Sequence, residues 1–179
     1  MNRFVKQISS RLSLRDPQRE SLEILAEVVD NISLEKNTSS EQVQHKLNVI
    51  KNLFPSVEDF EREFPSICFA LATGVGKTRL MGAFISYLYL AKGIKNYFVL
   101  APNLTIYEKL IQDFTPNTKK YVFKGISQFA TKEPLIITGE NYEESAMWLL
   151  DPDTVKINIF NISKINTEVR GGNSPRIKR

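Results

Sequence analysis

A short glycine-rich segment constrains the fold of this chain more than any other feature. Residues 67–71 before it are all apolar, as in a strand buried on both faces. Residues 77–92 after it are apolar on most sides and end at Gly93, as in a buried helix. The segment between them reads Thr73-Gly74-Val75-Gly76-Lys77-Thr78. A strand, a tight glycine turn and a helix in this order predict an α/β fold built on a parallel sheet.

The residue types of this segment suit a nucleoside triphosphate. Gly74 and Gly76 let the backbone turn inward, so that N–H groups point at the phosphates. The start of the following helix adds free N–H groups and the positive end of its dipole. We expect Lys77 to reach the β- and γ-phosphates and the Thr78 hydroxyl to ligate magnesium, so both would serve catalysis. The expected ATP–Mg²⁺ site comprises Thr73, Gly74, Val75, Gly76, Lys77 and Thr78.

Periodicity divides the chain into two parts. Residues 1–65 contain apolar stripes at helical spacing and predict an N-terminal helical segment. Residues 66–179 alternate between strand and helix patterns, which predicts a P-loop NTPase domain. The strands are expected at residues 67–71, 97–101, 121–123, 135–138 and 156–162, and the helices at 77–92 and 105–114.

Composition excludes several classes of protein. The only cysteine is Cys68, so an internal disulfide is impossible, which fits a reducing cytosol. The longest apolar run, residues 81–91, is too short to cross a bilayer. The net charge of +4 comes from the basic residues of segment 164–179, which we interpret as a solvated terminus. We therefore expect a cytoplasmic protein without a membrane partner.

One departure from the strict phosphate-loop motif points to a superfamily. Leu71 stands where the strict motif has glycine, and with this change the segment resembles motif I of superfamily 2 helicases and translocases. Residues 14–18, Leu-Arg-Asp-Pro-Gln, resemble the glutamine motif of the same superfamily. The resemblance implies that Arg15 and Gln18 bind the nucleotide, with the Gln18 amide offering a donor and an acceptor to adenine.

A third segment follows the second expected strand. Residues 100–104, Leu-Ala-Pro-Asn-Leu, resemble motif Ia, which contacts the DNA backbone in these motors. Asn103 and Thr105 stand at an expected helix start, where they would donate to a phosphate. A strand end followed by a helix cap explains the same residues equally well, with Thr105 and Glu108 as a possible capping box.

The chain is most similar to a narrower family. Residues 69–79 and 159–166 resemble the restriction (Res) subunit of type III restriction enzymes and related DEAD/DEAH-box proteins. The resemblance implies a RecA-like sheet and ATP-driven movement on duplex DNA. It also implies a modification (methyltransferase) partner subunit and, in full-length members, a C-terminal nuclease.

The carboxylate pair that such motors use to hold magnesium and polarise water is not evident. Residues 147–151 imitate its strand and end in Asp151, but Pro152 stands where glutamate is needed. No nuclease pattern is found either. We therefore expect an N-terminal fragment with an incomplete RecA-like sheet that binds nucleotide weakly and hydrolyses it poorly alone.

Two other classes remain open from the sequence. One is a different P-loop protein, such as an AAA-type ATPase, a transporter ATPase or a small-molecule kinase. The glutamine motif favours superfamily 2, and the transporter signature L-S-G-G-Q is missing. The other is a non-hydrolysing interaction module, which an intact fold without ATP binding would favour.

Overall fold

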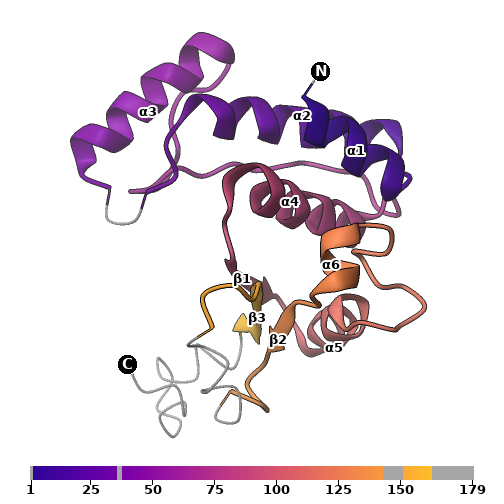
Figure 1. Ribbon diagram of the computed structural model, residues 1–179. Coiled ribbons are helices and arrows are strands. Elements are labelled where there is room, and N and C mark those ends of the chain that lie inside the picture. Colours follow the sequence, from indigo (N-terminus) through magenta and orange to yellow (C-terminus); the bar gives the residue numbers. More distant parts are fainter. Residues whose placement is uncertain (1, 36–37, 143–150, 163–179) are drawn as a thin grey trace, which may run out of the picture.

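A computed structural model describes residues 2–35, 38–142 and 151–162 as a layer of helices above a small sheet (Figure 1). Three helices form the outer layer, and a fourth lies between them and the sheet. These helices are α1 (Arg3–Arg11), α2 (Asp16–Asn31), α3 (Ser40–Leu53) and α4 (Lys77–Lys92).

The sheet has three parallel strands in the order β1–β3–β2. The strands are β1 (Asn96–Ala101), β2 (Leu135–Ile137) and β3 (Lys156–Asn161), and they alternate with the helices α5 (Leu104–Phe114) and α6 (Ser127–Thr131). The central strand is covered on both sides, and Ile157 and Ile159 are fully buried. The polar Lys156 and Asn161 of this strand are buried together with these isoleucines, so both faces of β3 are covered.

The helical layer is held together by apolar stripes. Val5 and Ile8 of α1 and Leu22 of α2 are buried at helical spacing where these helices pack against α4. On α4 the small Ala83 is fully buried, so the helices approach closely. Burying one such large aliphatic side chain contributes about 1.5–3 kcal/mol, so this face secures the position of α4.

A polar network joins the ends of three helices. The Tyr87 hydroxyl of α4 donates to the Asp30 carboxylate of α2 at 3.0 Å and accepts from Asn2, the N-cap of α1, at 2.7 Å. Lys92 forms an ion pair with Asp30 at 2.8 Å. Partial burial raises the pKa of Asp30, but the hydrogen bonds from Lys92 and Tyr87 outweigh it and hold that pKa below its usual range. The network therefore fixes α4 relative to α1 and α2.

The expected α/β fold with a parallel sheet is confirmed. The helix predicted at residues 77–92 has those bounds, and strands occupy the predicted positions around residues 97–101, 135–138 and 156–162. The spacing of Ser39 and Gln42 also predicts a capping box for a helix, and this box is present at the start of α3, with bonds of 3.3 and 2.8 Å. The basic residues of segment 164–179 lie outside the described residues.

The strand predicted at residues 67–71 is wrong. This segment has no regular structure, and Ile67 is 43% exposed while Cys68 is exposed rather than part of the core. A strand needs a hydrogen-bonded neighbour, and no described strand pairs with this segment. The apolar run therefore indicates a preference for a buried strand, but the segment does not form one in this structure.

Two smaller predictions are also wrong. No strand forms at residues 121–123, where a turn spans residues 122–125 and buries Val122 and Phe123. The capping box of Thr105 and Glu108 is replaced by Asn103, whose side chain accepts from the Ile106 N–H at 2.9 Å. The sequence pattern therefore predicted the wrong structure at both places. At the first the chain packs as a turn, and at the second Asn103 caps the helix instead.

The helix set also differs in detail from expectation. The pair Asp16-Pro17 predicts a helix with Asp16 as its N-cap, but α2 begins at Asp16 itself, and Arg15 is its N-cap. Helices α1 and α6 were not predicted. Across the described ranges, no helix is both long enough and apolar enough to cross a membrane.

Candidate nucleotide-binding site

The phosphate loop, residues 73–78, leads directly into α4. Gly76 is the N-cap of this helix with φ +95° and ψ 48°, and Gly74 has φ +83°. Both conformations lie in the left-handed region, which costs other residues about 1–2 kcal/mol. A Cβ atom on Gly76 would lie 2.7 Å from the Gln18 Nε2, whereas one on Gly74 would meet nothing within 4 Å. Position 76 therefore requires glycine for two reasons: its φ is positive, and a side chain there would clash with Gln18.

Two residues at the start of α2 hold the loop from one side. The Gln18 Nε2 donates to the Gly76 carbonyl at 2.9 Å, and the Arg15 guanidinium donates to the Gly74 carbonyl at 3.3 Å. The Gln18 Oε1 accepts from the Arg15 N–H at 2.9 Å, and Gln18 is only 2% exposed. The structure thus brings the expected glutamine motif against the expected phosphate loop, although they are about 60 residues apart.

This brace orients the donors of the loop. In a trans peptide the C=O and the following N–H point in opposite directions, and the described chain contains no cis peptide. Because the carbonyls of Gly74 and Gly76 point toward α2, the N–H groups of Val75 and Lys77 point away from it. The loop therefore presents donors on the side opposite α2, as an anion site at a helix start requires.

The side chains expected to act on phosphate are unengaged. Lys77 is exposed, Thr78 is half-buried, and neither side chain has a hydrogen bond or ion pair with another described residue. Thr73 is also exposed, and Val75 is half-buried. An ammonium and a hydroxyl remain free at the positive end of α4, where negative charge is favoured.

Thr78 provides an oxygen suited to magnesium. Magnesium in phosphate sites is held by few protein ligands, together with phosphate oxygens and water. The described residues contain no group of three or more His, Cys, Asp or Glu side chains that could hold a metal. A single hydroxyl at the start of α4 therefore fits magnesium that is carried in with a nucleotide.

A cleft of about 630 Å³ adjoins the loop and is lined in part by Gly76, Thr78 and Arg79. Its other cationic residues come from the end of α1, from α5 and from the connection between α5 and α6: Arg11, Lys109, Lys119, Lys120 and Lys124. Sequence reasoning missed this cleft because it counted net charge, and only Lys119-Lys120 with Lys124 gave a local signal.

The residues expected to contact DNA lie at the carboxyl end of β1. The Asn103 oxygen is used as the N-cap of α5, and Thr105 is exposed in the first turn of that helix. The Asn103 amide nitrogen and the Thr105 hydroxyl bond no other described side chain or backbone group. Among the described residues, no hydrogen bond or ion pair joins Asn103 or Thr105 to the phosphate loop.

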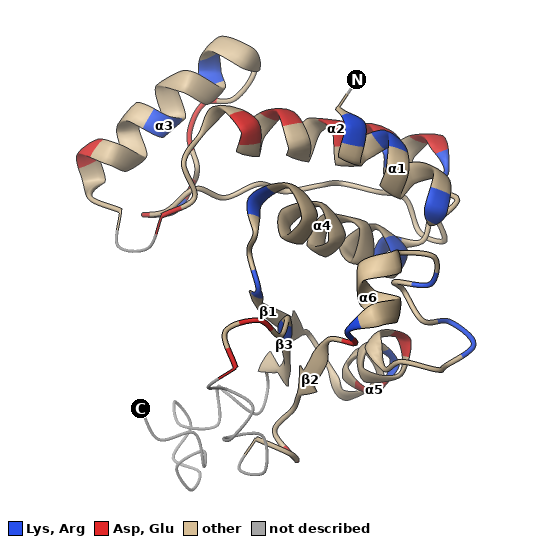
Figure 2. Cartoon of the chain, viewed as in Figure 1, with Lys and Arg blue, Asp and Glu red and all other residues tan. Residues whose placement is uncertain are grey.

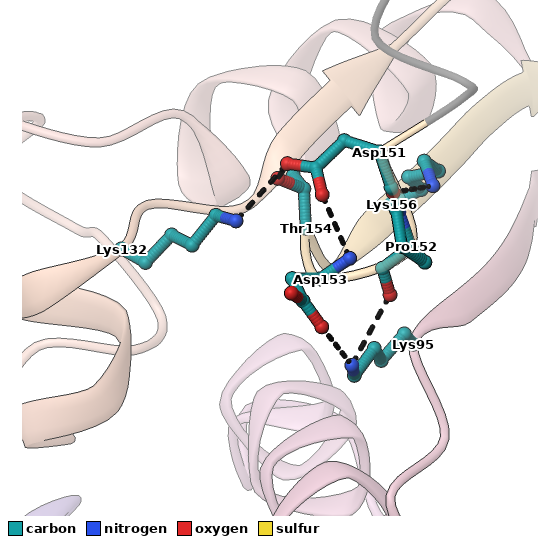
Figure 3. Close-up of polar contacts among 7 residues, drawn as sticks. All are labelled: Lys95, Lys132, Asp151, Pro152, Asp153, Thr154 and Lys156. Carbon is teal, nitrogen blue, oxygen red and sulfur yellow. Dashed lines mark hydrogen bonds and ion pairs between the residues drawn. The ribbon is translucent and has the colours of Figure 1, made fainter.

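Asp151 begins a turn before β3 (Figure 3). Its carboxylate accepts from the Asp153 N–H at 2.8 Å and from the Thr154 hydroxyl, and it pairs with Lys132 at 3.0 Å. The hydrogen bond from Thr154, supported by those from Asp153 and Lys132, holds the pKa of Asp151 well below its usual range. All the observed roles of this carboxylate are structural.

The position of Asp151 agrees with this role. Ligands of parallel α/β sheets bind at the carboxyl ends of the strands, and Asp151 precedes the amino end of β3. Lys95, just before β1, reaches the same turn and bonds Asp153 and the Pro152 carbonyl at 3.0 and 3.1 Å (Figure 3). The turn therefore ties together the amino ends of two strands.

Comparison with known proteins yields one match. A family model described as type III restriction enzyme, res subunit, matches residues 11–178. No curated protein matches the chain, and no solved structure does. Because the family model spans nearly the whole chain, the chain belongs to the type III restriction enzyme Res subunit family, and its phosphate loop is that of a helicase-like ATP-binding module of the superfamily 2 kind.

Proposed function

We propose that this chain is the ATP-binding part of a DNA translocase, the restriction subunit of a type III restriction–modification system. The observation that carries the proposal is the phosphate loop, whose carbonyls are held by Arg15 and Gln18 at the start of α2, while the side chains of Lys77 and Thr78 bond no other described residue. The family match supports the kind of module. The proposed partners are duplex DNA and a modification subunit, and the proposed place of action is the cytoplasm.

Each residue of the loop has a proposed role in binding ATP. The N–H groups of Val75 and Lys77 donate to phosphate oxygens, and the Lys77 ammonium neutralises the β- and γ-phosphates. The Thr78 hydroxyl is the proposed protein ligand of magnesium, which supplies charge neutralisation at the phosphates when it is bound. Gly74 and Gly76 act through their backbone conformation.

Arg15 and Gln18 are proposed to support nucleotide binding by holding the phosphate loop in place. One Gln18 N–H and one Oε1 lone pair are used within the chain, which leaves one donor and one acceptor for the adenine edge. Its burial limits direct access by a base. We therefore propose that bracing the loop is its main contribution and that adenine selectivity is the smaller one.

Asn103 and Thr105 are proposed to contact a DNA phosphate. Both stand in the first turn of an 11-residue helix, where free N–H groups add to the Asn103 amide and the Thr105 hydroxyl. The parallel sheet and the phosphate loop further support a RecA-like arrangement.

ATP hydrolysis by this chain alone is proposed to be slow. Asp151 is used structurally, and no described cluster of carboxylates is available to polarise a water molecule. Steady ATP turnover by the purified chain that Lys77→Ala abolishes would contradict this part of the proposal.

Calorimetric titration tests nucleotide binding directly. ATP, ADP and GTP are titrated with magnesium into the chain, and ATP is also titrated in the presence of a chelator. The expected result is binding that prefers ATP over GTP and weakens without magnesium. A chain that circular dichroism shows to be folded and that binds none of these nucleotides would overturn the proposal.

A further inference from the structure

The basic cleft beside the phosphate loop contains cationic residues that have no role in the proposed nucleotide site. We define it by its six cationic residues, which are Arg11, Arg79, Lys109, Lys119, Lys120 and Lys124. We propose that the basic cleft binds the phosphodiester backbone of a nucleic acid. This site is additional to the contacts proposed for Asn103 and Thr105, and it does not depend on ATP binding.

The charges of the cleft are uncompensated. None of its six cationic side chains forms an ion pair with another described residue, whereas Lys92, Lys95 and Lys132 elsewhere each pair with an aspartate. Among the described residues that line the cleft, Asp113 is the only acidic one and is 4% exposed, so six cationic side chains face one carboxylate. Like charges gathered in one concave surface repel one another unless a polyanion neutralises them.

The distribution of charge over the molecule favours the basic cleft over the exposed face of α2. Glu20, Glu23 and Glu27 are exposed along α2, and Figure 2 shows red on this helix. Blue segments gather instead around the end of α1, the start of α4 and the connection between α5 and α6 (Figure 2). A nucleic acid is therefore repelled by the outer face of α2 and attracted to the cleft.

The lysine-rich wall of the cleft is anchored. The Val122 N–H donates to the Asp113 carbonyl at 2.9 Å, and Val122 lies so close to Gly82 of α4 that a Cβ there would be 2.9 Å from its own Cβ. Gly125 has φ +101°, and a Cβ on it would lie 2.9 Å from the Arg11 carbonyl oxygen. These contacts hold the backbone between Lys119 and Lys124 in place, so less entropy is lost when a phosphate chain binds.

A nucleic acid is the occupant that this chemistry favours. The cationic residues come from four separate stretches of the chain, so the positive surface is extended, as a repeating chain of phosphates requires. Tyr121 and the Gly125 backbone also line the cleft, and a tyrosine ring offers a surface to a sugar or base. Gly76 and Thr78 of the phosphate loop also line the cleft.

The test measures binding of a fluorescein-labelled DNA duplex of about 20 base pairs by anisotropy, at salt concentrations between about 50 and 200 mM. The cleft variant is Lys119→Gln, Lys120→Gln and Lys124→Gln together. The control variant removes the same charge from exposed residues elsewhere, Arg3→Gln, Lys6→Gln and Arg62→Gln. ATP affinity and the thermal melt are measured on both variants.

The proposal expects the cleft variant to lose about tenfold or more in DNA affinity. The slope of log affinity against log salt should become shallower by about 2.7, because each lost phosphate contact contributes about 0.9. The control variant should change the affinity by less than about threefold. If the triple variant melts early, the three single variants should each weaken binding in smaller steps.

Three results would overturn the proposal: no DNA binding by the unmodified chain, equal losses in the cleft and control variants, or full affinity in the cleft variant. Failure of the proposed nucleotide-binding function can be distinguished from failure of the basic-cleft proposal. A chain that binds DNA through the cleft but does not bind ATP would retain this site and refute the nucleotide site alone.

Discussion

The phosphate loop before α4 and the turn of residues 151–155 before β3 are both short polar connections, but they use their charged groups in opposite ways. In the turn, Asp151 pairs with Lys132 and Asp153 pairs with Lys95. In the loop, only the backbone carbonyls of Gly74 and Gly76 are held, while Lys77 has no partner among the described residues.

This difference separates a structural connection from a binding site. Lys77 is exposed, so water solvates its ammonium, which stays available to an anion at the start of α4. The turn satisfies its own charges and thereby stabilises the amino edge of the sheet. The loop holds its backbone rigid and leaves donors and a cation for a ligand, as a preorganised site does.

The largest expected effect is on nucleotide affinity. Lys77→Ala should weaken ATP binding by about 10- to 100-fold, or about 1.4–2.8 kcal/mol, because the cation over the phosphates is lost. Calorimetry measures it. Lys132→Ala is the matched control from the turn, and it should leave ATP affinity unchanged. Equal losses of ATP affinity in both variants would show that the loop and the turn do not differ as a binding site and a structural connection.

The next effect concerns the backbone of the loop. Gly76→Ala forces an L-residue to φ +95° and pushes its Cβ onto Gln18, so it should destabilise the fold by about 1–2 kcal/mol and also weaken ATP binding. Gly74→Ala has the same strain without the clash and should cost less. Chemical denaturation of both variants measures the difference. A greater loss at Gly74 would show that the Gln18 contact does not constrain the loop.

Removal of the brace should have a moderate effect. Gln18→Ala removes one of the two hydrogen bonds that the Gly76 carbonyl accepts, the other coming from the Leu80 N–H at 3.1 Å. We expect a loss of about 1 kcal/mol in stability with a parallel loss in ATP affinity. If bracing dominates, ATP and GTP affinities should fall together in calorimetry. Selective loss of ATP binding with unchanged stability would instead show that Gln18 acts as the adenine reader.

The smallest effect is expected at the turn and depends on pH. The folded-state pKa of Asp151 lies below its ordinary value, so the ionised carboxylate stabilises the fold at neutral pH. This contribution should be lost as the pH falls below the unfolded value of about 4. Asp151→Asn should therefore lower the melting temperature at pH near 7 and not in acid, without changing ATP binding. Equal destabilisation at both pH values would assign the effect to geometry and not to charge.

Much of the fold was predictable because local signals agree with packing. The glycine turn and the apolar helix after it predicted α4 with its bounds, and the alternating pattern predicted the three strands of the sheet. The strand at residues 67–71 was not predictable as an irregular segment, because an apolar run records a preference for burial and not the presence of a pairing partner.

The candidate site also has features that the sequence predicted and features that it did not. The residue types of the phosphate loop indicated a phosphate site before any geometry was known, since few patterns combine two glycines, a lysine and a hydroxyl at a helix start. Sequence also suggested that Arg15 and Gln18 belong to the site. It did not indicate that both would bond the carbonyls of the loop, because such a contact depends on how α2 packs against α4.

The sequence by itself determined the presence of a phosphate loop, the alternation of strands and helices, and the family. These follow from chemistry encoded by neighbouring residues, whose spacing is set by the covalent chain. Tertiary structure alone decided that Asp151 is a structural carboxylate, that Gln18 is a buried brace, and that cations from four stretches line one cleft. Each of these depends on distances between residues far apart in the chain, which only packing determines.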